Sequence, residues 1–124
     1  MSGLARRPKA LRIAEAARER LAEDVVALDV RQAVSFADTF VVASGRSDRH
    51  VRSIGDAIAE ALAESGEKPL GVEGYEEGRW LLMDFGDVIV HVFQPEVRRH
   101  YDLERLWSDA TPMDVTPPAA RKRV

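Results

Sequence analysis

Two carboxylates and one histidine beside a predicted β-turn come nearest to catalytic spacing in this chain. Asp84 and Asp87 lie on either side of Gly86, and His91 follows four residues after Asp87. A general acid–base pair needs its two groups within hydrogen-bond reach, and strand register places His91 diagonally across from Asp84. Acids beside a turn commonly serve the turn itself, and Asp87 occupies a favoured loop position. Turn chemistry is therefore the favoured interpretation, and an Asp84–His91 dyad is the alternative.

Other chemical motifs are sparse. The histidines His50, His91 and His100 have neither HxxxH nor HxH spacing, and the chain has no cysteine for a thiolate, a disulfide or a Cys-based zinc site. No GxGxxG or Walker loop occurs. Residues 44–47, Ser-Gly-Arg-Ser, precede a helix pattern and could hold an anion, but a plain helix cap is favoured. We expect no catalytic residue, no metal and no cofactor.

The segment from Arg79 to Ala110 predicts a β-hairpin followed by a helix. Residues 85–88, Phe-Gly-Asp-Val, offer a two-residue Gly-Asp loop that suits a type II′ turn. Side chains alternate with period two, so this loop fixes which residues share a face. One face, the hydrocarbon face, carries Leu81, Met83, Phe85, Val88, Val90 and Val92. The opposite face, the mixed face, carries Trp80, Leu82, Asp84, Ile89, His91 and Phe93.

The two faces predict different roles. The hydrocarbon face must be core, whereas the mixed face combines aromatic, aliphatic, acidic and imidazole groups, as partner-binding surfaces do. We therefore predict its six residues as the partner-binding site. An exposed Trp80 would be an anchor for a partner, although cover by the 67–78 loop or by a helix is an equally weighted alternative. Trp107 is expected to be a core anchor.

Element patterns predict one α/β domain over residues 9–110, built as a single mixed sheet with flanking helices. Helices are expected at 9–22, from Ser47 to Gly66, and from Pro95 onward; strands are expected at 24–30, 38–44, 80–85 and 88–93, with an edge strand at best within 67–78. Residues 1–8 are expected to form a disordered basic arm. Residues 111–124, with three prolines, are expected to form a disordered basic tail.

The net charge of −3 hides an acidic body. Seven basic residues lie within 1–12 and 121–124, which leaves 11 of the 18 Lys and Arg against all 21 Asp and Glu. Such an acidic body is a poor binder of nucleic acid but suits a basic protein partner. An equally common explanation is that the acidic residues serve only to keep the protein soluble. The chain has no apolar run of the ~20 residues that a membrane helix needs and no secretory h-region. We expect a soluble cytoplasmic protein.

Three stretches carry a family resemblance: ADTFVVASGRSDRHVRSI at 37–54, WLLMDFGD at 80–87, and GDVIVHVFQPEVRRHYDLERLW at 86–107. They closely resemble the ribosomal silencing factor family, also called RsfS or Iojap, over about residues 9–110. The resemblance implies a fold similar to nucleotidyltransferases without their activity. That enzyme class has Gly-Ser before a helix and Asp-x-Asp on the next strand, whereas here Ser44-Gly45 is reversed and no Asp-x-Asp occurs. The family pattern does not require the proline-rich basic tail after Ala110.

The resemblance also implies a function. Family members bind the large ribosomal subunit through its L-fourteen-type ribosomal protein, block joining of the small subunit, and so damp translation in starved or stationary cells. Organelle relatives act in large-subunit assembly, which is one alternative for this chain. A relic metal-dependent nucleotidyltransferase using Asp84 and Asp87 is a second, and a homodimer formed through the sheet face or an edge strand is a third.

Overall fold

A computed structural model describes residues 6–101 and 110–115 of the chain. Its elements follow in the order α1 (Arg6–Glu19), β1 (Glu23–Asp29), β2 (Thr39–Ser44), α2 (Asp48–Ala63), β3 (Gly71–Glu73), β4 (Trp80–Asp84), β5 (Val88–Phe93), α3 (Pro95–Tyr101) and β6 (Thr111–Met113). The strands form one sheet in the order β3-β4-β5-β2-β1-β6. The predicted α/β class with a single mixed sheet is confirmed.

The sheet is mixed because of how α2 crosses over it. The helix carries the chain from β2 to the far edge, where β3 lies, and β4 and β5 then return towards the centre. As a result β5 lies parallel to β2, while the other strand pairs are antiparallel. A parallel pair needs such a long crossover connection, and here that connection includes a helix.

The hairpin has the predicted register. Leu81 pairs with Val92 and Met83 with Val90, and the amide of Phe85 donates to the carbonyl of Val88 at 2.9 Å. Gly86 has a φ of +89°, the left-handed value that the first loop position of a type II′ turn requires. The six residues of the hydrocarbon face are all buried, against a core to which α1 and α2 contribute.

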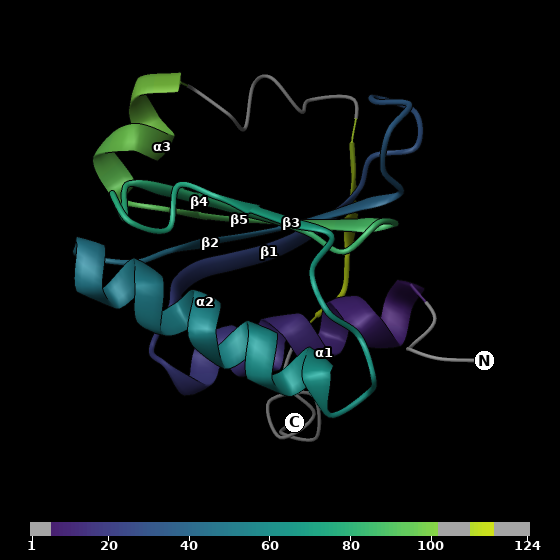
Figure 1. Cartoon of the computed structure of the whole chain (residues 1–124). Coiled ribbons are helices and arrows are strands. Elements are labelled where there is room, and N and C mark those ends of the chain that lie inside the picture. The colour runs from purple at the N-terminus through teal and green to yellow at the C-terminus, as the bar shows by residue number, and fades with distance from the viewer. Residues whose placement is uncertain (1–5, 102–109, 116–124) are drawn as a thin grey trace, which may run out of the picture.

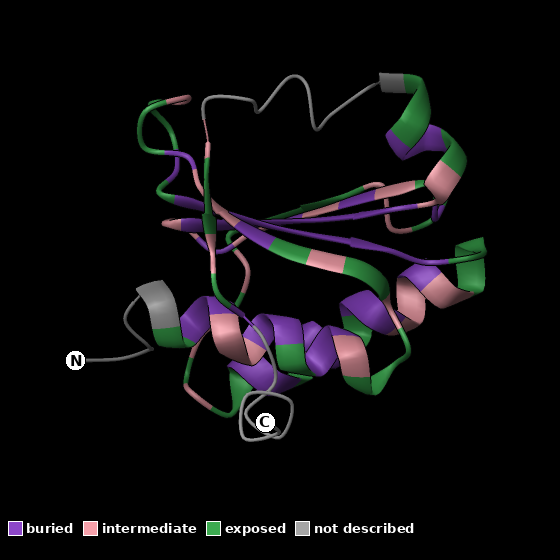
Figure 2. Ribbon diagram, turned by 180° about the vertical axis from the view of Figure 1, so that it is seen from behind, coloured by how far each residue is buried: buried purple, intermediate pink, exposed green. Residues whose placement is uncertain are grey.

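The two faces of the sheet differ in their cover. Helices α1 and α2 lie together beneath one face, and the shorter α3 lies on the other side at one end (Figure 1). Seen from behind, the sides of α1 and α2 that face the sheet are largely buried (Figure 2). The sheet side that carries α3 has a smaller apolar cluster, completed by the loop between β1 and β2.

Both termini correct the predicted domain limits. Helix α1 begins at Arg6, so part of the expected 1–8 arm is helical; Pro8 lies in the first turn, where its missing N–H costs nothing. The tail expected to be disordered from 111 begins instead with β6, which pairs with β1, and Val115 is buried in the core. Pro112 is tolerated because β6 is an edge strand.

Lys9 is one of the basic residues near the N-terminus, yet the structure buries it. Its side chain is 3% exposed, and the ammonium donates to the carbonyl of Phe85 at 3.0 Å and to Asp87 Oδ1 at 2.7 Å. Burial lowers the pKa of Lys9, but the carboxylates of Asp87 and Glu67 outweigh it and raise that pKa above its ordinary value. Lys9 therefore remains charged and ties α1 to the hairpin turn.

Candidate functional site

The structure brings all six predicted partner-binding residues to the mixed face but leaves only half of them accessible. Trp80, Leu82 and Asp84, on β4, are half-buried. Their neighbours on β5, Ile89, His91 and Phe93, are buried with 5%, 5% and 0% exposure. The cover comes from a cluster that includes Val30, Ala37 and Val97. Of the six predicted residues, those of β4 are therefore the accessible ones, while those of β5 lie beneath the cover; their role in partner binding stays a prediction.

Trp80 lies on an aromatic layer. Its ring centroid is 4.8 Å from that of Phe93 and 6.1 Å from that of His91, and its indole Nε1–H donates to His91 Nδ1 at 3.2 Å. The imidazole in turn contacts the edge of Phe40 with a centroid distance of 4.8 Å. The indole of Trp80 thus packs partly into the apolar cluster and is partly accessible. This position is intermediate between the exposed anchor and the covered residue considered from the sequence.

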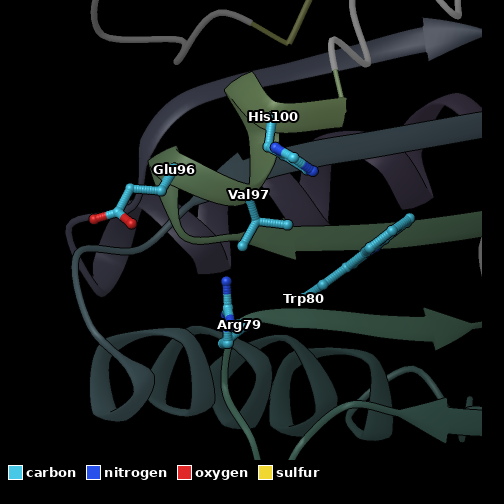
Figure 3. A pocket seen from close by; sticks show the side chains of 5 residues that line it. All are labelled: Arg79, Trp80, Glu96, Val97 and His100. Atoms are coloured by element: carbon cyan, nitrogen blue, oxygen red, sulfur yellow. The ribbon is translucent and has the colours of Figure 1, made fainter.

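A cavity of about 530 Å³ opens beside Trp80, lined by Arg79, Trp80, Glu96, Val97 and His100. Figure 3 shows that α3 contributes Glu96, Val97 and His100, while Trp80 begins β4 and Arg79 immediately precedes it. Val97 is buried and forms an apolar wall, whereas Arg79, Glu96 and His100 are exposed. Exposed polar side chains thus stand beside an apolar wall, a combination that also occurs in protein-binding sites.

Phe36 is an exposed aromatic residue that sequence reasoning missed. Its side chain is 68% exposed, and its ring centroid lies 6.1 Å from that of Phe40, which belongs to the same apolar cluster as Phe93. The residue falls in the connection between β1 and β2, where the sequence has no strand or helix periodicity. A large aromatic ring in a connection whose other apolar residues are all the smaller valine and alanine was the available signal.

The two turn carboxylates have structural partners. Asp84 Oδ1 accepts from the amide of Gly86 at 2.8 Å, and Asp87 Oδ1 accepts from Lys9. The first contact closes the hairpin loop in the way that Asx turns do. The Asp84 contact agrees with turn chemistry, whereas Asp87 forms an ion pair with Lys9. The imidazole of His91 bonds to Trp80.

The Ser44–Ser47 segment is a helix cap, as favoured from the sequence. The amide of His50 donates to Ser47 Oγ at 3.1 Å, and the amide of Arg46 donates to His50 Nδ1 at 2.9 Å. Because Nδ1 accepts, the ring proton is on Nε2, which donates to the carbonyl of Arg20 at 2.7 Å. His50 thus links α2 to the turn after α1.

Within residues 6–101 and 110–115, no three His, Asp or Glu side chains gather in a group that could hold a metal ion. No helix in those ranges is long and apolar enough to span a membrane. Trp107, expected to be a core anchor, lies outside the described residues.

Comparison with known proteins gives consistent matches. A family described as "Ribosomal silencing factor during starvation" matches residues 5–124. The ribosomal silencing factor RsfS of Bacillus subtilis is 42% identical over 106 residues, which cover 85% of this chain and 90% of that protein. The mouse protein "Mitochondrial assembly of ribosomal large subunit protein 1" is 31% identical over 73% of this chain and 41% of its own length.

A solved structure is similar over nearly the whole fold. The crystal structure of a protein from Chromobacterium violaceum matches with a TM-score of 0.82 and 33% sequence identity, covering 94% of this chain and 99% of that one. The sheet and helices described above are therefore shared with an experimentally determined relative. The likeness to nucleotidyltransferases stays a prediction.

Burial of His91 predicts a pH-dependent stability. Burial lowers the pKa of His91 to about 4. The unfolded chain then binds more protons than the folded one between pH 4 and 6.5, so this contribution is complete above pH 6.5 and is lost as pH falls towards 4. It amounts to about 3 kcal/mol. Urea unfolding of the wild type and His91→Phe should show their stability difference shifting by that amount; a difference constant with pH would contradict the assignment.

Proposed function

Since this chain belongs to the ribosomal silencing factor family, we propose that it binds the large ribosomal subunit and blocks joining of the small subunit. The proposed contact is with the L-fourteen-type ribosomal protein, as the family resemblance implies. The action is steric: the chain occupies a surface that the small subunit needs, and no substrate is turned over. The observation that most supports this proposal is that part of the mixed face is left uncovered. The chain outside its basic termini is also acidic, which suits a basic partner.

The proposed contact surface consists of Phe36, Trp80, Leu82 and Asp84. Three of them are apolar side chains with accessible area on the mixed face or beside it, and Asp84 adds a carboxylate near the hairpin tip. Interfaces draw most of their affinity from such apolar centres, and aromatic residues predominate in them. The acidic body of the chain suits a basic ribosomal protein and would favour its encounter at low salt.

A role in large-subunit assembly is the second candidate. It is favoured by the relative whose name states mitochondrial assembly of the ribosomal large subunit. Both functions need binding to the same subunit, so they differ in timing rather than in the surface used. Enrichment of the chain on immature large-subunit particles, rather than on mature ones, would favour assembly. A homodimer remains a third expectation, and light scattering across protein concentrations tests it.

Co-sedimentation with separated ribosomal subunits tests the proposal. The chain should pellet with large subunits and not small ones, and it should reduce the monosome peak when subunits are mixed. Trp80→Ala should weaken binding by about 2 kcal/mol, because a half-buried indole would no longer fill the partner's surface. Leu21→Ala, which alters an exposed apolar residue at the end of α1, is the matched control and should bind normally. Equal binding to both subunits would refute the proposal.

Two substitutions of Asp84 distinguish the effect of its charge on binding from its role in the hairpin turn. Asp84→Asn keeps an acceptor for the amide of Gly86 and removes only the charge, so it should fold normally and bind somewhat more weakly. Asp84→Lys places a positive charge against a basic partner and should abolish association. Melting temperatures of both variants show whether the fold survives. Normal binding of folded Asp84→Lys would remove Asp84 from the interface.

A further inference from the structure

We propose that His91 is a positioning residue that fixes the orientation of the Trp80 indole for partner binding. The inference rests on the proposed function, because it takes Trp80 as a contact residue. His91 itself is 5% exposed and so presents almost no surface to a partner. Its effect is transmitted through the hydrogen bond that it accepts from Trp80.

The chemistry of the two groups fixes the proton positions. The indole Nε1–H can only donate, so His91 Nδ1 must be the acceptor in their 3.2 Å contact. A neutral ring then carries its proton on Nε2. A doubly protonated imidazole would set two donors against each other and break the bond. The buried environment that favours the neutral form of His91 therefore also maintains the acceptor.

The imidazole is itself held rigidly. It lies on β5 between β4 and β2, parallel to the ring of Phe93 at 2° with a centroid distance of 5.7 Å, and against the edge of Phe40. Strand pairing places His91 opposite Leu82, so the bond to Trp80 runs diagonally across the β4–β5 hairpin. An acceptor fixed on a central strand can orient an indole on the neighbouring strand.

Orientation of this kind increases affinity by lowering the cost of ordering. A tryptophan that is held in its bound rotamer before association loses less conformational freedom on binding. Without an acceptor at His91, the half-buried indole N–H would have to turn towards water. The side chain would then populate other rotamers, and the partner would have to select one of them.

Three variants separate the hydrogen bond from ring packing. His91→Phe keeps an aromatic ring and removes the acceptor, whereas His91→Asn keeps an acceptor at the δ position in a smaller side chain. Phe40→Leu changes the packing around His91 without touching the acceptor, and it serves as the control. The melting temperature of each variant is measured first, and all assays are run well below the lowest value.

The first readout is the indole Nε1–H signal of Trp80 in ¹⁵N-labelled full-length protein, assigned by comparison with Trp107→Phe. In the wild type and in Phe40→Leu, this proton should exchange slowly with solvent. His91→Phe should speed its exchange, and His91→Asn should restore protection. An unchanged Trp80 signal in His91→Phe would overturn the inference without any reference to ribosomes.

The second readout is affinity for purified large subunits. His91→Phe should weaken binding about tenfold, the size expected when one large side chain must be ordered on association, and His91→Asn should recover most of that loss. If His91→Phe releases the indole but binds as well as the wild type, while Trp80→Ala binds poorly, the inference fails and the proposed function stands. If Trp80→Ala binds normally, Trp80 is not a contact residue, so the proposed contact surface fails and the positioning role of His91 in binding fails with it.

Discussion

The rest of the structure depends on one constraint: β5 is predominantly apolar on both of its faces, with His91 as its one polar residue, and must be covered on both. Its six residues, Val88–Phe93, are all buried. Helices α1 and α2 meet this demand on the hydrocarbon face. On the mixed face, α3 and the loop after β1 cover β5 but reach only part of β4. The partly accessible strip on β4 is a consequence of this unequal cover.

The unequal cover of the two sheet faces also bears on function. Within the described residues, the polar groups considered as candidates for catalysis or anion binding have structural partners. Asp84 closes the hairpin turn, Ser47 caps α2, and Asp87 pairs with Lys9, so these groups stabilise the fold. What faces solvent on the mixed face is an indole, a leucine and a carboxylate, with an exposed phenylalanine close by. Such a surface is suited to binding a macromolecule, and the acidic composition of the chain outside its two termini suits a basic one.

Local rules predicted the hairpin well because its two-residue loop and period-two alternation leave one register. They also identified Ser47 as a helix cap and β3 as an edge strand. They failed where long-range contacts decide. Burial of Lys9 depends on carboxylates far along the chain, and β6 depends on an open edge at β1. Likewise, burial of Ile89, His91 and Phe93 depends on α3 and a loop that lack any pairing signal with β5.

The central claim is that the accessible part of the mixed face meets the large subunit. Hydroxyl-radical footprinting of the full chain, free and bound to purified large subunits, with side-chain oxidation read by mass spectrometry, tests it most directly. Our account predicts that Trp80, Leu82 and Phe36 become protected while Leu21, at the end of α1, is oxidised equally in both states. Protection confined to α1 and α2, with Trp80 unchanged, would contradict it.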